Sequence, residues 1–334
     1  MSRSRSLKNK LLTNEMIVLY IIIGLSILIG SLNSNFFSVS TLILLARALL
    51  VTMIFAICEM MVIVSGGIDV SFPAIASFCM YGTLQLVNAM GIDNVFLTFL
   101  IAAVIGMLFG TLNAILIAIF KIPPLIATLG VSSVTNGATL AFLGTNIISD
   151  IPDSLDNASK TFLFSFTTDK GITYSLTILF VIPVVVAVLA YILLRHTMLG
   201  RGIYAIGGDI RAARIAGFNV KKIQFFVYIT VGAVVGIGSI AYMILMRQAD
   251  PSVLMGSEMM VIAAVVIGGT RINGGHGTVI GTVLGVILIT LVQNNLIMIK
   301  VPTHYQTFVV GLIIVIGTAI TSIRAKRVAA KAKV

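Results

Sequence analysis

Long apolar runs alternate with short polar segments along the whole chain. About 20 apolar helical residues cross a hydrocarbon core of about 30 Å. Ten such runs occur, at residues 16–31, 42–64, 71–90, 95–119, 124–143, 173–194, 224–246, 254–270, 277–299 and 304–323. The pattern predicts an all-α fold, a polytopic transmembrane helical bundle of about ten spans. The first five and the last five spans are candidates for a 5+5 inverted repeat, which is common in transporters.

The composition excludes an ordinary soluble protein. Of 334 residues, 58% are hydrophobic and only 10% are charged, and the mean hydropathy is +1.12. A soluble chain of this size carries far more charge on its surface. The net charge of +11 does not indicate nucleic-acid binding, because the basic residues cluster beside apolar spans, as they do in membrane proteins.

The positions of the basic residues predict the topology. With the N-terminus inside and ten crossings, 17 of the 22 Lys and Arg residues fall on the cytoplasmic side, as the positive-inside rule requires. Both termini are then cytoplasmic, and basic tails at 1–15 and 324–334 flank a membrane domain at 16–323. Eight spans would keep the termini inside and are the main alternative. We expect residues 16–31 to be an uncleaved span, with a signal peptide as the alternative.

The most distinctive polar segment is residues 195–222. It carries six cations and one acid, Asp209. Burying six Lys or Arg side chains in a bilayer would cost on the order of 15–20 kcal/mol, so the segment lies outside the hydrocarbon. Its length and its short Ala-rich centre predict a docking element.

Motifs for catalysis are absent from the sequence. There is no HExxH, GxSxG or CxxC motif, and the three histidines are scattered. Gly202 and Gly207 have Walker-A spacing, but Gly208 and Asp209 follow them instead of Lys and Ser/Thr, so no phosphate clamp is present. We expect no catalytic residues, no metal site and no cofactor, with ATP and Mg²⁺ bound by a partner.

Uncharged polar residues within the spans are candidates for a solute pathway. Amides and hydroxyls suit a neutral, hydroxyl-rich solute, and small residues leave room between helices. Hydrogen bonds between helices and tight packing are the alternative roles. Glu59 is the one acid well inside a span; a relay for ion coupling is one role for it, and a hydrogen bond to a neighbouring helix or a position near the interface is the other. The pathway candidates are Asn113, Thr128, Ser132, Asn136, Gly268 and Gly269.

A glycine turn, SGGIDVS, joins the second and third spans. Gly66 and Gly67 permit backbone conformations closed to other residues. Asp69 or Ser71 is suited to cap the next helix, with Pro73 in its first turn. Gating of a solute is the alternative role of the turn.

Four motifs together resemble the ribose-type sugar permeases of ABC importers, whose members carry ribose, xylose, arabinose, galactose or autoinducer-2. They are SGGIDVS at 65–71, KIPPLIATLG at 121–130, MLGRGIYAIGGDIRAARIAGFNV at 198–220 and EMMVIAAVVIGGTRINGGHGTVIGTVLG at 258–285. They occur in the family's order and span most of the chain. This chain departs from the family's pattern at Phe72-Pro73, where Gly is usual, and at Asp209, where Asn is frequent.

The resemblance implies a subunit of the bacterial inner membrane that works with an ABC ATPase, an extracytoplasmic sugar-binding protein and a second permease copy, identical or similar. It also implies that a short helix within 195–222 couples to the ATPase, with small residues on one face. Ala212, Ala213 and Gly217 resemble the family's small-residue pattern, and the candidate coupling residues are Asp209, Arg211, Ala212, Ala213, Arg214 and Gly217. A stand-alone secondary transporter or channel, and a membrane enzyme acting on lipid-linked sugars, are the rival classes.

Overall fold

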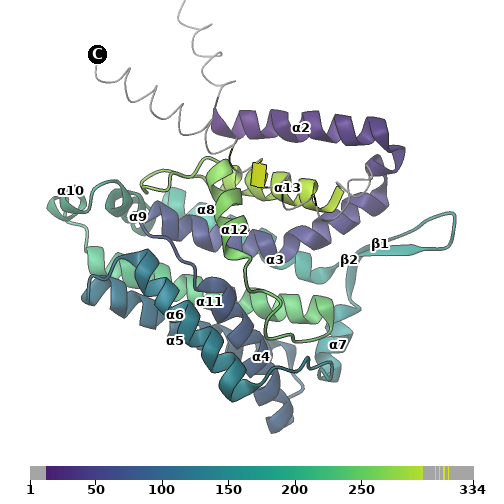
Figure 1. Cartoon of the computed structure of the whole chain (residues 1–334), viewed down its shortest axis with the longest axis horizontal. Helices are drawn as coiled ribbons and strands as arrows, with labels where there is room; N and C mark the ends of the chain where they lie inside the picture. Colours follow the sequence, from purple (N-terminus) through teal and green to yellow (C-terminus); the bar gives the residue numbers. More distant parts are fainter. Residues whose placement is uncertain (1–12, 296–304, 306–307, 309–310, 313–314, 316–334) are drawn as a thin grey trace, which may run out of the picture.

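The structure, a computed structural model, describes residues 13–295 together with 305, 308, 311, 312 and 315. Most of the predicted tenth span, the end of the predicted ninth span, the C-terminal tail and most of the N-terminal tail lie outside the described residues. Helices α2 and α13 lie along one side of the molecule, α3 runs through its middle, and α4, α5, α6 and α11 form the other side (Figure 1).

The described elements are mostly helices, and most of them follow the apolar runs. The helices are α2 (Asn14–Leu32), α3 (Val39–Val64), α4 (Phe72–Met90), α5 (Val95–Ala114), α6 (Pro124–Ala138), α7 (Asp153–Ser159), α8 (Val181–His196), α9 (Met198–Gly208), α10 (Ile210–Ile215), α11 (Val220–Met246), α12 (Glu258–Ile267) and α13 (Val279–Asn295). Single π-helical turns extend α5 to Ile119 and α6 to Leu143. Short 3₁₀ turns at Ser34–Phe37 and Ile178–Phe180 precede α3 and α8.

The core is built around α3. Nearly every side chain of this helix from Leu50 to Val64 is buried, and α8, α11, α12 and α13 pack against it. The outer helices expose large apolar side chains instead, such as Phe96 at 76% and Phe142 at 85%. Apolar side chains on the outside and apolar side chains in the core are what a helical bundle surrounded by lipid requires.

Small residues bring α5 and α11 into very close contact. A Cβ atom added at Gly106 would overlap the carbonyl group of Gly232, and one added at Gly110 would overlap the carbonyl oxygen of Tyr228. Gly106 and Gly110, like Gly232 and Gly236, have the four-residue spacing that lets membrane helices approach backbone to backbone. The spacing is visible in the sequence, but the pairing of these two helices is not.

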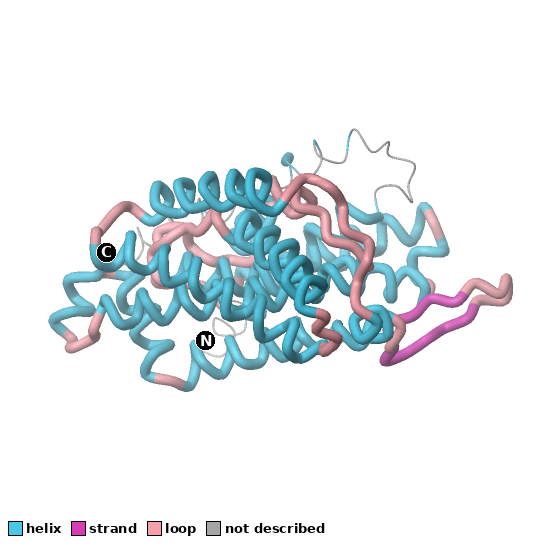
Figure 2. The backbone as a smooth tube through the Cα atoms, turned by 90° about the horizontal axis from the view of Figure 1, so that it is seen from below, coloured by secondary structure: helices cyan, strands magenta, loops and turns pink. Residues whose placement is uncertain are grey.

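The start of the predicted sixth span is wrong. Residues Thr173–Thr177 form strand β2, which pairs antiparallel with β1 (Phe162–Thr167), and the helix α8 begins only at Val181. The prediction of an all-α fold is therefore also wrong in this part of the chain. Thr and Tyr favour strands, and Gly171, with φ +78°, lets the chain turn back. The hairpin projects beyond the helices (Figure 2).

The predicted eighth span is too long. Its helix, α12, has 10 residues and is therefore about 15 Å long, half the thickness of a bilayer core. Gly256, with φ +80°, and Gly269, with φ +100°, end the helical run on both sides.

Among the described residues, six helices are long and apolar enough to cross a membrane. They are Asn14–Leu32, Val39–Val64, Val95–Ile119, Pro124–Leu143, Ile178–His196 and Val220–Met246. They identify a helical membrane protein.

The loops gather at two opposite ends of the molecule. Helices α9 and α10 lie at one end, and α7 with the hairpin lies toward the other (Figure 1). At the α7 end, Asp156 forms ion pairs with Lys160 and with Arg247, the residue that ends α11. These cations lower the pKa of the Asp156 carboxyl group. Loops far apart in the sequence are thus joined there by polar contacts.

Candidate functional site

The polar segment 195–222 folds mainly into two short helices, and the helices on either side extend into it. Helix α8 continues to His196, and α11 begins at Val220. Between them, the Thr197 hydroxyl accepts a hydrogen bond from the Gly200 amide at 3.0 Å and caps α9. Asp209 caps α10, since its Oδ1 accepts the amides of Arg211 at 2.7 Å and Ala212 at 3.0 Å. Asp209 therefore fixes where α10 starts.

Helix α10 presents an apolar and basic surface to the outside. Ile215 is 89% exposed and Ile210 is 46% exposed, and Arg211, Ala212 and Arg214 are exposed as well. Ala213, in contrast, is 3% exposed and faces the protein, so the small residues of α10 do not all lie on its exposed face.

Gly217 ends α10. Its φ is +87°, a left-handed conformation that glycine adopts at low cost. Its amide donates to the Arg214 carbonyl at 3.0 Å, and the next amide, of Phe218, donates to the Ala213 carbonyl at 3.1 Å. No atom lies within 4 Å of a Cβ added here. The glycine is thus required by the backbone turn and not by close packing.

The C-terminal end of α9 is packed against two other motifs through glycines. We call Gly66, Gly207, Gly274 and Gly275 the glycine junction. A Cβ added at Gly207 would overlap the carbonyl oxygen of Val64 and lie 2.7 Å from the Gly275 nitrogen. A Cβ at Gly274 would lie 2.8 Å from the Gly66 Cα. Three of the four motifs found in the sequence meet at this point.

Two hydrogen bonds hold the junction together. The Gly275 amide donates to the carbonyl of Val64, the last residue of α3, at 2.9 Å. The Tyr204 hydroxyl on α9 donates to the Gly277 carbonyl at 2.7 Å, and partial burial raises the pKa of this tyrosine. The C-terminal part of α9 is therefore in direct contact with the end of α3 and with the loop before α13.

Beyond Gly66 the chain turns back alongside α3 through residues 67–71, which form no helix or strand and which we call the extended segment, before α4 starts. The Asp69 amide donates to Glu59 Oε1 at 3.2 Å. Asp69 Oδ1 accepts the Ser71 amide at 2.7 Å and the Ser71 hydroxyl at 2.6 Å. Ser71 itself makes no side-chain cap bond to α4, while Pro73 lies in the first turn as predicted.

This segment is bound to α5 and α6 by two predicted pathway residues. Asn113 Nδ2 donates to the Ser71 hydroxyl at 2.8 Å. The Thr128 hydroxyl accepts the Val70 amide at 3.3 Å and lies 3.0 Å from the Pro124 carbonyl. We call Glu59, Asp69, Ser71, Asn113 and Thr128 the buried polar cluster; each is at most 2% exposed.

The other predicted pathway residues lie elsewhere. Ser132 and Asn136 follow Thr128 at four-residue spacing on one face of α6 and are half-buried. Gly268 packs against the backbone of Gly281 on α13, and Gly269 packs against Asn14 on α2. These two glycines serve close helix packing, the alternative role named for them.

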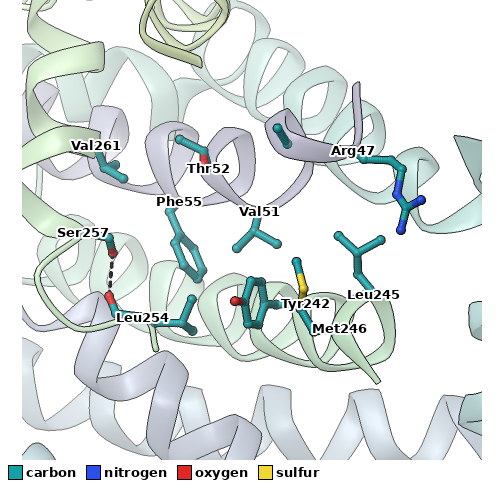
Figure 3. A pocket seen from close by; sticks show the side chains of 11 residues that line it. Arg47, Val51, Thr52, Phe55, Tyr242, Leu245, Met246, Leu254, Ser257 and Val261 are labelled. Atoms are coloured by element: carbon teal, nitrogen blue, oxygen red, sulfur yellow. Dashed lines mark hydrogen bonds between the residues drawn. The ribbon is translucent and has the colours of Figure 1, made fainter. Parts of the chain in front are cut away.

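The structure also contains a cavity of about 150 Å³ between α3, α11 and the start of α12 (Figure 3). Phe55, Tyr242 and Leu254 form its apolar walls, and Arg47 of α3 lies at its edge. None of the predicted pathway residues lines it. Ligand pockets are usually about 300–1,000 Å³, so this cavity alone is small for a solute site. The sequence signal for it was Arg47, a cation inside an apolar run.

Comparison with known proteins identifies the family. The family model described as branched-chain amino acid transport system / permease component matches residues 41–317. The fructose import permease protein FruG of Bifidobacterium longum is 34% identical over 303 residues, covering 88% of this chain and 83% of that protein. The autoinducer 2 import system permease protein LsrC of Yersinia pseudotuberculosis is 30% identical over 293 residues, covering 88% and 80%.

A further relative covers nearly the whole chain. The ribose import permease protein RbsC of Escherichia coli is 28% identical over 307 residues, covering 92% of each protein. No solved structure gives a significant match. The family description names one component of a transport system, which disfavours a stand-alone transporter or a membrane enzyme. The chain therefore belongs to this family of permease components and is a multi-pass permease subunit of an ABC importer in the bacterial plasma membrane.

Proposed function

We propose that this permease carries a sugar or sugar-like solute into the cytoplasm, driven by a separate ATPase and supplied by an extracytoplasmic solute-binding protein. The observation that carries the proposal is that relatives matching at least 88% of the chain are named as fructose, autoinducer 2 and ribose import permeases. The uncharged amide and hydroxyl groups of the buried polar cluster and of α6 suit a hydroxyl-rich solute.

The proposed topology has about ten spans with both termini in the cytoplasm. The distribution of the loops supports it. Ten alternating spans put residues 65–70, 195–222 and 271–276 on the cytoplasmic side, and these segments meet at the glycine junction. They put 91–94, 144–172 and 247–253 outside. There the Ser154 amide donates to Asp93 at 2.7 Å, and Arg247 pairs with Asp156. Eight spans remain the alternative, and the inverted repeat remains a prediction.

The ATPase docks on α10 in this proposal. An isoleucine that is 89% exposed on a helix outside the membrane gains free energy only when another surface covers it. Exposed Arg211 and Arg214 flank it and are suited to pair with carboxylates of the partner. ATP and Mg²⁺ bind to that partner, and this chain only receives the movement.

The glycine junction passes this movement to the solute pathway. A displacement of α10 moves α9, and Gly207 of α9 packs on Val64 and Gly275 without intervening side chains. From Gly66 the same backbone continues to Asp69 and Ser71 of the buried polar cluster. Nucleotide binding to the ATPase shifts the permease between two conformations only if the ATPase binds these conformations with different affinities. In this proposal, α10 is the surface whose contacts with the ATPase differ between the two conformations.

The opposite end of the molecule is the surface for the binding protein. The hairpin of β1 and β2 projects there, and Phe162, Leu163 and Phe164 are each about half exposed. A second copy of the permease, or a similar subunit, completes the solute pathway, which agrees with the small volume of the cavity in one chain.

Reconstitution tests the proposal. Proteoliposomes that contain this permease, its ATPase and the binding protein should accumulate labelled ribose or fructose only with ATP inside. The matched control is the same preparation without the ATPase. Uptake that persists in that control would contradict an ABC importer and support a stand-alone transporter. If the complete system transports other solutes but neither ribose nor fructose, the proposed ATP-driven import stands and the proposed sugar substrate is wrong.

A further inference from the structure

The buried polar cluster carries two carboxyl groups and no cationic partner. Glu59 is 1% exposed and Asp69 is 2% exposed. Within the part of the chain that the structure describes, neither forms an ion pair with Lys, Arg or His. An unpaired carboxylate in a membrane protein is costly to bury and is usually kept for a function.

The hydrogen bonds of the cluster show which groups lack partners. The Ser71 hydroxyl has a single proton, which it donates to Asp69 Oδ1 at 2.6 Å. It must therefore accept from Asn113, so the group 2.8 Å away is the amide nitrogen Nδ2. The oxygen Oδ1 of Asn113 then has no donor, and neither has Oε2 of Glu59. Asn113 Oδ1 is an acceptor, and Glu59 Oε2 is an acceptor when its carboxyl group is ionised.

The backbone of the extended segment adds further free oxygens. Within the described chain, no hydrogen bond reaches the carbonyl oxygens of Gly67, Asp69 and Val70. The segment runs beside α3 at the level of Glu59, because the Asp69 amide bonds to that side chain. In other transporters, non-helical backbone buried inside the bundle coordinates ions through its carbonyl oxygens.

We propose that the buried polar cluster is a binding site for one hard cation, Na⁺ or Ca²⁺, held by oxygen ligands. The ligands are drawn from Glu59, Asp69, Asn113 and the free backbone carbonyls of residues 67, 69 and 70. Oxygen donors of this type suit hard cations rather than zinc or copper. The described residues contain no group of three or more His, Cys, Asp or Glu side chains that could hold a metal ion, so the amide and the backbone carbonyls have to supply the remaining ligands.

A bound cation would join α3, the extended segment and α5. It would lower the free energy of the state in which these elements are together by RT ln(1 + [L]/Kd), where [L] is the concentration of free cation. The permease would then depend on an ion as well as on ATP, although the ion need not be transported.

The test uses the purified permease–ATPase complex in lipid nanodiscs without nucleotide. Thermal unfolding is followed while choline chloride is replaced by NaCl, KCl or CaCl₂ at constant ionic strength and constant pH. We expect the unfolding midpoint to rise with Na⁺ or with Ca²⁺ but not with K⁺. Binding of ²²Na⁺ or ⁴⁵Ca²⁺ should saturate at one ion per chain, and the two isotopes identify which cation the site takes.

Three variants separate the site from general effects. Asn113→Ala removes an unpartnered oxygen, and Glu59→Gln removes the charge of another. Both variants should lose isotope binding and the cation-dependent rise of the unfolding midpoint. Ser239→Ala is the control, because Ser239 is buried on α11 and bonds only within its own helix; it should keep both. If Glu59→Gln does not fold, Asn113→Ala decides the question alone.

Several results would overturn the proposal. Saturating isotope binding could be absent, or it could persist unchanged in Asn113→Ala. The midpoint could also respond to pH and to no cation. The last result would show that the cluster binds a proton and not a metal cation. Glu59 and Asp69 would then share that proton, and the neighbouring titratable groups are Cys58 on α3 and Tyr228 on α11.

Discussion

Gly207→Ala tests the glycine junction with the smallest change available, one methyl group. The added Cβ would overlap the Val64 carbonyl oxygen and lie 2.7 Å from the Gly275 nitrogen and 2.9 Å from the Val64 carbonyl carbon. These are backbone atoms, so no side chain can rotate to make room. Relief requires α9 to move away from α3 by more than about 1 Å, and overpacking of this kind costs about 1–3 kcal/mol.

Gly208→Ala is the matched control. It lies at the next position of α9, and a Cβ added there meets no atom within 4 Å. Alanine at this position should be neutral or stabilise α9 by up to about 1 kcal/mol, because glycine is a poor helix former. The two variants carry the same added methyl group and differ only in what that group meets.

The assay compares ATP hydrolysis with solute uptake in the same proteoliposomes. A change of 1–3 kcal/mol between two conformations corresponds to about 5–150-fold in their ratio. We therefore expect Gly207→Ala to hydrolyse ATP while its uptake per ATP falls about fivefold or more. Its unfolding midpoint should also fall, whereas Gly208→Ala should match the unchanged protein in both respects. Equal uptake per ATP in the two variants would refute transmission through the junction.

Three further predictions address other parts of the chain. Ile215→Asp should abolish co-purification of the ATPase without changing the unfolding midpoint, because this side chain is 89% exposed; retained co-purification would exclude α10 as the dock. Gly106→Leu should reduce the monodisperse fraction in size-exclusion chromatography by separating α5 from α11, at a cost of about 1–3 kcal/mol, whereas Gly24→Leu, with no atom within 4 Å of its added Cβ, should not. Asp156 has a pKa lowered by Lys160 and Arg247, so it stabilises the fold above its unfolded pKa of about 3.9. The unfolding midpoint of Asp156→Asn should thus lie slightly below that of the unchanged protein near neutral pH and converge with it as the pH falls through the folded pKa; a constant difference would exclude the ion pairs as its cause.

The helices were predictable where the apolar run alone determines them. The runs 42–64 and 95–119 correspond to helical segments at Val39–Val64 and Val95–Ile119, because a long run of apolar residues has few other ways to satisfy its backbone in a bilayer. The prediction failed at 173–194, where strand β2 and helix α8 follow one another without a polar break. Hydropathy records how apolar a segment is, but it does not distinguish a short strand from the first turns of a helix.

The candidate residues were predictable by type, and their partnerships were not. Asp69 and Asn113 were each recognisable as polar groups in or next to an apolar segment. Ser71 bonds to both of them. Its bond to Asn113 joins residues that are 42 positions apart in the sequence, so it depends on how α5 packs beside the extended segment. Glu59 entered the cluster because the chain reverses at Gly66 and returns along α3, and no local pattern specifies that return.

Glycine has a different meaning at each of the three places where this fold depends on it. At Gly217 it permits a positive φ, so a side chain there would strain the turn that ends α10. Gly106 allows α5 and α11 to approach, and that contact lies within the bundle. At Gly207 it places the backbone of the coupling region directly on the backbone of α3, and a larger residue there would put a side chain between them. A rigid contact between backbones passes on a displacement without loss to rotamer changes, which is why Gly207, rather than the more exposed Gly217, is the position where one added methyl group should separate ATP hydrolysis from transport.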